Sequence, residues 1–107
     1  MIFGTTRDKD LLGQLDALLP CFDTIIATRY IENPRAVPPE TIADRILEVF
    51  GRPVLTTVDP AQALELARSL TAPNDLICIT GSLFLAAESR AIILPQAASP
   101  VFTYAVT

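Results

Sequence analysis

The sequence predicts an α/β protein of Rossmann-like type, a three-layer α/β/α sandwich with a mainly parallel sheet of about four or five strands. Short apolar runs of strand length alternate along the chain with longer segments in which apolar residues recur at helical spacing. The short runs are continuously apolar, which is typical of parallel strands that are buried on both faces. Because parallel crossovers are right-handed, helices are expected to cover both faces of the sheet.

The apolar runs are expected to form strands in chain order. They lie at Ile2–Phe3, 23–28, 53–58, 76–79 and 101–106. The last run is expected as an edge strand or as a mobile end.

The segments between these runs are expected to form helices. They cover 8–19, Pro39–Phe50, 59–70 and 82–94. Gly51 is placed to end the second helix. Asp59 and Gln62 form the pattern of a capping box, with Pro60 at the first helical position. The third helix is expected to present one apolar face, formed by Ala63, Leu64, Ala67 and Leu70.

Length and composition indicate one folded domain over 1–107. Half of the residues are hydrophobic and 19% are charged, which disfavours disorder. No apolar run approaches the roughly 18 residues of a membrane span, and the first residues do not resemble a signal peptide. A cytoplasmic protein without a membrane partner is therefore expected. With a net charge of −4 and scattered basic residues, nucleic acid is disfavoured as a partner.

The absence of histidine narrows the chemistry that the chain can perform. It removes Ser–His and Cys–His catalysis within one chain, and two separated cysteines cannot fill a zinc shell. No catalytic residue and no metal ligand is therefore assigned. Cys78, inside an apolar run, is expected to be a buried thiol, and Cys21 to be half exposed. A disulfide between them is not expected.

Three loops follow the carboxyl ends of the first, second and fourth strands, where open α/β sheets bind their ligands. In the first loop, Asp8 is placed to cap a helix and Asp10 to favour its dipole. Alternatively, Asp8, Lys9 or Asp10 contacts a nucleotide or a charged substrate. In the second loop, Arg35 lies between prolines, and a guanidinium held in this way suits a carboxylate or a phosphate. A solvated surface arginine is the alternative.

The third loop, Thr80-Gly81-Ser82, joins the fourth strand to a helix. Either Ser82 or Thr80 caps the helix, or the turn binds an anion at the helix N-terminus, where unpaired N–H groups and the helix dipole attract negative charge. The patterns GxGxxG and GxxxxGK(S/T) do not occur, so a triphosphate cradle is not expected within the chain.

Taken together, these loops resemble the C-terminal domain of folylpolyglutamate synthase/dihydrofolate synthase, a branch of the Mur ligase superfamily. The resemblance covers roughly residues 2–90, and its motifs are specific as an ordered set rather than singly. They are Phe3-Gly4, Asp8-Lys9-Asp10, Phe22-Asp23, Thr28, Pro34-Arg35-Ala36, Thr80-Gly81-Ser82-Leu83-Phe84-Leu85, Glu88 and Arg90.

The resemblance implies an ATP-dependent ligase that joins L-glutamate to a folate, with Mg²⁺ and ATP bound mainly by an N-terminal domain. A carboxylate of the substrate is phosphorylated, and the glutamate amino group attacks the acyl phosphate. By motif, Ser82 contacts glutamate, with Gly81, Thr80 and Arg35 lining the same cleft. Asp8, Lys9 and Asp10 line the nucleotide side of that cleft. The 107-residue chain alone is expected to be inactive.

The resemblance also implies that the chain is truncated at the N-terminal side of this domain. In the family, a strand absent here lies beside the strand equivalent to 76–79. The tail at 101–106 is therefore expected to fold back over that edge, or two chains to pair there as a homodimer. The alternative to a ligase part is a free-standing, non-catalytic module for subunit association or small-molecule binding.

Overall fold

A parallel sheet with the strand order β3-β2-β1-β4-β5 forms the centre of the molecule. The structure is a computed structural model that describes residues 1–7, 9–96 and 102–107. Within these residues the strands are β1 (Ile2–Phe3), β2 (Ile26–Ala27), β3 (Leu55–Thr56), β4 (Leu76–Thr80) and β5 (Thr103–Val106).

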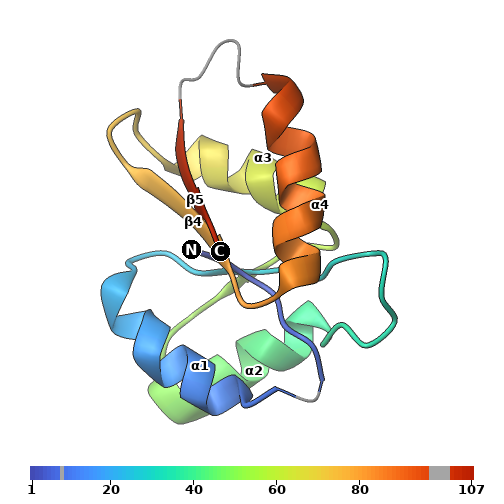
Figure 1. The fold of residues 1–107 in the computed structure, drawn as a ribbon. Coiled ribbons are helices and arrows are strands. Elements are labelled where there is room, and N and C mark those ends of the chain that lie inside the picture. Colours follow the sequence, from blue (N-terminus) through green and yellow to red (C-terminus); the bar gives the residue numbers. More distant parts are fainter. Residues whose placement is uncertain (8, 97–101) are drawn as a thin grey trace.

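Helices cover both faces of this sheet. They are α1 (Leu11–Leu18), α2 (Pro39–Phe50), α3 (Pro60–Leu70) and α4 (Leu83–Ile93), with short 3₁₀ turns at Leu19–Cys21 and Leu94–Gln96. Figure 1 shows α1 and α2 in the lower half of the molecule and α3 and α4 in the upper half, where β4 and β5 also run. The predicted three-layer α/β/α sandwich is confirmed. None of the described helices is long and apolar enough to cross a membrane.

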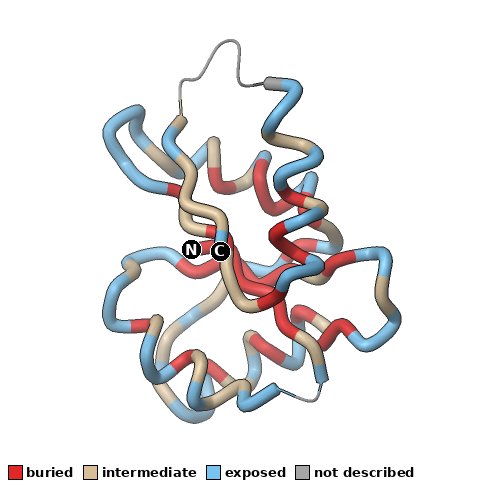
Figure 2. Tube along the Cα trace, in the orientation of Figure 1, coloured by how far each residue is buried: buried red, intermediate tan, exposed pale blue. Residues whose placement is uncertain are grey.

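Two buried clusters fill the space between the layers. Successive residues of a strand point to opposite faces, so Ile2 packs in the cluster under α3 and α4, and Phe3 packs in the cluster with α1 and α2. Figure 2 shows the buried residues gathered along the strands in the middle of the molecule. Leu64 and Ile79 belong to the first cluster, and Leu15 to the second.

Several elements are shorter than the sequence predicts. β2 and β3 each contain only two ladder residues, and each pairs with a strand of two residues, Ile2–Phe3 for β2 and Ile26–Ala27 for β3. The first helix begins at Leu11, and Asp10 caps it; the prediction that Asp8 caps it was wrong, and Asp8 itself lies outside the described residues. A side chain at position 10 can reach the N–H of Gly13 in the first turn.

Three burial predictions also need correction. Leu70 does not share the buried face of α3, because the last turn of α3 lies beyond the core and leaves Leu70 51% exposed. Cys78 is half-buried rather than buried, since it lies on the face of β4 opposite Ile77 and Ile79. Cys21 is exposed, and both cysteines are free.

The tail of the chain covers the free edge of β4, as expected. β5 pairs in parallel with β4 from Leu76↔Thr103 to Ile79↔Val106, while position 101 of the predicted run lies outside the described residues. Arg68 of α3 donates to the hydroxyl of Tyr104 at 2.7 Å and anchors β5 from the helix layer. Because β5 occupies this edge, two chains do not need to pair there.

Candidate functional site

The loops after β1 and β2 lie against each other at the carboxyl edge of the sheet. Thr6 and Ala36 form an isolated antiparallel bridge. The N–H of Arg7 donates to the carbonyl of Arg35 at 2.9 Å, and the N–H of Val37 donates to the carbonyl of Thr5 at 2.9 Å. These backbone bonds place the loop that carries Arg35 beside the loop that carries Lys9.

The turn at 80–82 approaches the loop after β1 closely at Gly81. Gly81 has φ of 111°, a conformation that glycine adopts at little cost. A Cβ atom at this position would lie 2.3 Å from the carbonyl oxygen of Gly4 and 2.9 Å from Cε2 of Phe3. The N–H of Gly4 in turn donates to the carbonyl of Thr80 at 3.4 Å. The close approach therefore depends on a glycine at position 81.

Two side chains from the first loop and α1 contact this turn. Lys9 Nζ and Gln14 Nε2 each donate to the carbonyl oxygen of Gly81 at 3.3 Å. Thr5 Oγ1 donates to Gln14 Oε1 at 3.0 Å and fixes the orientation of the Gln14 amide. Lys9 and the turn are thus brought together as the sequence predicts, whereas the Asp10 carboxylate is engaged with the N–H of Gly13 at 3.1 Å.

Ser82 caps helix α4. Its Oγ accepts a hydrogen bond from the N–H of Phe84 at 3.1 Å, and the residue is only 4% exposed. The hydroxyl of Thr80 accepts a hydrogen bond from Thr107 Oγ1 at 2.9 Å. The capping interpretation of Ser82 is confirmed, and its contact with glutamate stays a prediction.

Glu88 and Tyr30 tie the loop after β2 to α4, and the sequence analysis gave neither of them this role. The Glu88 carboxylate accepts bonds from the N–H groups of Ile31, at 2.8 and 3.0 Å, and of Glu32, at 2.9 Å. The Tyr30 ring stacks on Phe84 with centroids 5.3 Å apart. In the sequence, Tyr30 stands out as the one tyrosine in the long loop at 28–39. Nothing in the sequence pattern indicates that its partner is Phe84.

Half of the basic residues come from the two loops at the carboxyl edge, although the sequence analysis expects them to be scattered. These four are Arg7, Lys9, Arg29 and Arg35. Arg7, Lys9 and Arg35 are exposed. The same two loop sequences also contain three acidic residues, so this edge offers single basic side chains for a carboxylate or phosphate rather than a field of one sign.

The described residues do not provide an evident metal site. No group of three or more His, Cys, Asp or Glu side chains within them is placed to hold a metal ion. Thr28, at the carboxyl end of β2, is fully buried, and its hydroxyl has no hydrogen-bond partner among the described residues.

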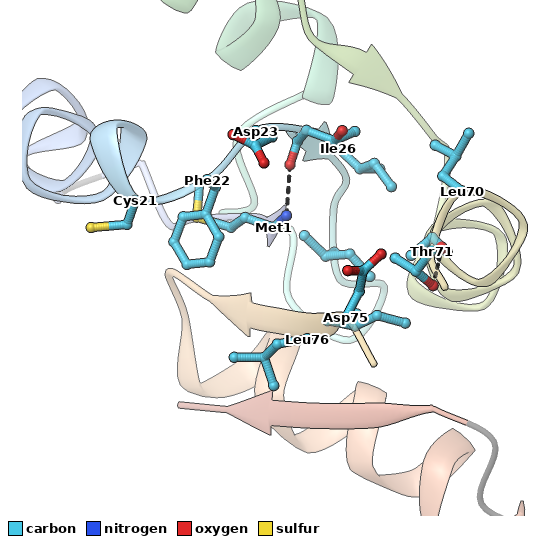
Figure 3. Close-up of a pocket in the computed structure, with 13 residues that line it drawn as sticks. Met1, Cys21, Phe22, Asp23, Ile26, Leu70, Thr71, Asp75 and Leu76 are labelled. Carbon is cyan, nitrogen blue, oxygen red and sulfur yellow. Dashed lines mark hydrogen bonds between the residues drawn. The ribbon is translucent and has the colours of Figure 1, made fainter. Parts of the chain in front are cut away.

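A cavity of about 310 Å³ lies at the opposite, amino edge of the sheet (Figure 3). Asp23 and Asp75 contribute carboxylates to its wall, and Leu70 and Leu76 contribute apolar surface. The nitrogen of Met1 donates to the carbonyl of Thr24 at 2.7 Å within it. None of the described residues predicted to form the site lines this cavity, so cavity and basic edge are separate features.

Comparison with known proteins identifies the family. The family described as Mur ligase, glutamate ligase domain, matches residues 1–83. The chain belongs to this family. The matched residues include all three loops of the carboxyl edge and end just after Ser82, so most of α4 and all of β5 lie beyond them.

A relative in Haloferax volcanii is described as a probable bifunctional folylpolyglutamate synthase/dihydropteroate synthase. The chain is 29% identical to it over 90 residues, which are 84% of this chain and 10% of the relative. The chain thus spans about a tenth of that protein's length. No solved structure matches the chain.

Proposed function

We propose that this domain forms the glutamate-receiving wall of an ATP-dependent amide ligase of the folylpolyglutamate synthase type. In that reaction an amide bond forms between the glutamate nitrogen and an acyl phosphate of the folate, and phosphate leaves. Family membership and the printed name of the Haloferax relative support this assignment. The main observation in its favour is that the turn at 80–82, Lys9 and the loop that carries Arg35 lie close together at the carboxyl edge of the sheet.

The charges of this edge match the charges of glutamate. L-glutamate carries two carboxylates, and carboxylates bind well to arginine, lysine and the N-terminus of a helix. Lys9 lies at the turn that opens α4, and Arg35 lies on the neighbouring loop. Ser82, through its cap, fixes the direction of the α4 N-terminus, and Gly81 and Thr80 set its distance from β1.

Mur ligases use ATP and Mg²⁺, and we assign both mainly to parts of a complete ligase outside this domain. The described residues lack a three-ligand metal cluster, and the sequence lacks a phosphate-binding glycine loop. We propose that the loop with Asp8, Lys9 and Asp10 lines the nucleotide side of the glutamate cleft. We therefore expect the chain alone to bind no ATP at detectable strength and to be inactive. The cytoplasmic location stays a prediction.

An NMR titration of the ¹⁵N-labelled chain with L-glutamate tests the proposal. We expect millimolar binding with shifts at 80–82 and in the Arg35 loop. Arg35→Gln and Lys9→Gln should each weaken it about tenfold, because a charged hydrogen bond contributes about 1.5–3 kcal/mol. Arg45→Gln on α2, which removes an equal charge elsewhere, is the matched control and should leave binding unchanged. Shifts confined to the amino-edge cavity, or tight ATP binding, would contradict the proposal.

Ser82 needs two variants because its hydroxyl also caps α4. Ser82→Ala removes both cap and hydroxyl, whereas Ser82→Asp keeps a capping oxygen and adds a negative charge. Both should abolish glutamate binding, but only Ser82→Ala should lower stability, by about 1 kcal/mol. Glutamate binding that survives Ser82→Asp would remove Ser82 from the cleft.

A second candidate is a non-catalytic module for association or small-molecule binding. The specific observation in its favour is β5, which completes the sheet beside β4 from within the same chain. A stably folded chain that binds neither glutamate nor ATP would favour this candidate.

A further inference from the structure

The backbone groups of Tyr104 and Val106 face the outer edge of β5, where the described residues provide no neighbouring strand. The N–H of Thr107 donates to the carbonyl of Ile79, and backbone groups of a strand alternate in direction along the chain. Residues 103, 105 and 107 therefore bond toward β4, while Tyr104 and Val106 direct their N–H and C=O groups away from the sheet. The bond from Arg90 Nη2 to the carbonyl of Val106, at 3.2 Å, independently shows this outward direction.

The two edges of the sheet differ in how well they are protected. β3 contains only two residues and lies between Pro53 and Pro60, which limits pairing with another strand. β5 carries the sequence Thr-Tyr-Ala-Val, without proline or charge, and it is the last strand in the sheet order. Such an edge is a template for another strand.

The face of α4 that points away from the core is apolar. Leu83 is 81% exposed and Leu94, just after the helix, is 68% exposed. Ala87 and Ala91, also exposed, continue the same stripe at helical spacing, and Arg90 is the charged residue beside it. The opposite face, with Leu85 and Ala86, is buried, so α4 carries apolar residues both toward the core and on part of its exposed surface.

We propose that two copies of this chain associate about a two-fold axis through the β5 edge and the adjoining α4 face. Antiparallel pairing with Ala105 at the axis places Tyr104 opposite Val106 of the second copy. Each such pair exchanges two hydrogen bonds, so the outward groups satisfy one another completely. The intervening non-hydrogen-bonded pair, which brings side chains closest, is formed by two small alanines.

The helix layer fits the same arrangement. α4 contacts both β4 and β5, and the proposed arrangement takes its axis to lie over the gap between these two strands. With strands about 4.8 Å apart, the α4 axes of the two copies would then lie about 9.6 Å apart. Helices pack at about 8–10 Å, and the antiparallel order brings Leu83 near Leu94 of the second copy. The single adjustment is that Arg90 must release the carbonyl of Val106, so Arg90 opposes association.

This association does not depend on the proposed ligase role, because it uses none of the residues assigned to glutamate. Most of its residues lie beyond residue 83, where the family match ends. The surface is thus a property of this chain's own C-terminal part.

Sedimentation equilibrium of the 107-residue chain over a concentration series tests the proposal. We expect a monomer–dimer equilibrium. Val106→Pro should raise the dimer Kd tenfold or more, since proline removes an outward N–H and leaves the bonds to β4 intact. Leu83→Glu should do the same without loss of stability, because a glutamate suits the first turn of a helix. Arg90→Ala should lower the Kd several-fold.

Leu47→Glu is the matched control, since Leu47 is an exposed leucine on α2, remote from β5. It should leave the Kd unchanged. A wild-type chain that stays monomeric at millimolar concentration would overturn the proposal. So would a dimer whose Kd responds to Leu47→Glu but neither to Val106→Pro nor to Leu83→Glu, with circular dichroism verifying that each variant is folded.

Discussion

Replacement of Gly81 by alanine probes the contact on which the carboxyl edge is built. The alanine Cβ would lie 2.3 Å from the carbonyl oxygen of Gly4 and 2.9 Å from the ring of the fully buried Phe3. A backbone oxygen cannot rotate away, so β1 and β4 would have to separate at their carboxyl ends. The turn at 80–82 would then move away from Lys9, which donates to the carbonyl of Gly81.

The expected cost has two parts. A positive φ costs a non-glycine residue about 1–2 kcal/mol, and overpacking of a rigid contact adds about 1–3 kcal/mol. Gly81→Ala should therefore lower the free energy of unfolding by about 2–5 kcal/mol. Gly51→Ala is the matched control, because Gly51 also has a positive φ, of 69°, but a Cβ there meets nothing within 4 Å. It should cost only about 1–2 kcal/mol.

Urea unfolding followed by circular dichroism measures both variants. With a slope of about 2 kcal/mol per molar urea, Gly81→Ala should shift the midpoint by about 1–2.5 M and Gly51→Ala by about 0.5–1 M. Equal shifts for the two variants would refute the reasoning, because they would show that the contact with Gly4 and Phe3 yields without cost.

Three further outcomes are expected. Arg52→Ala should destabilise the fold by about 1–3 kcal/mol, and Arg52→Lys by less, because the guanidinium donates to three carbonyls between α1 and β2. Equal unfolding midpoints for Arg52→Ala and the wild type would contradict this. Glu88→Gln should speed the amide hydrogen exchange of Ile31, because the Glu88 carboxylate accepts a hydrogen bond from the N–H of Ile31. An unchanged exchange rate by NMR would show that other contacts hold this loop. Cys21 should react with a thiol reagent at pH 8 faster than Cys78, since burial raises the pKa of the Cys78 thiol; equal rates by mass spectrometry would oppose this.

Local sequence patterns predicted most of the elements because the forces that define them are local. The capping residue Asp59 accepts from the N–H of Gln62 at 2.8 Å, and Gly51 ends α2 with a positive φ, as the spacing predicted. The predictions failed where partners come from distant parts of the chain. Glu88 binds N–H groups 56 and 57 residues away, and no periodicity marks such a pair.

By itself, the sequence determined the parallel α/β architecture, the helix caps, the family and the three loops at the carboxyl edge. Hydrophobic periodicity, turn chemistry and short motifs carry that information, because they depend on neighbours along the chain. Only the tertiary structure decided that the Ser82 hydroxyl is occupied as a cap and that half of the basic residues gather at one edge. It also decided that β5 pairs along the edge of β4 and is itself the outermost of the described strands on that side. Strand order and loop contacts are long-range, and they become definite only when the whole sheet has assembled.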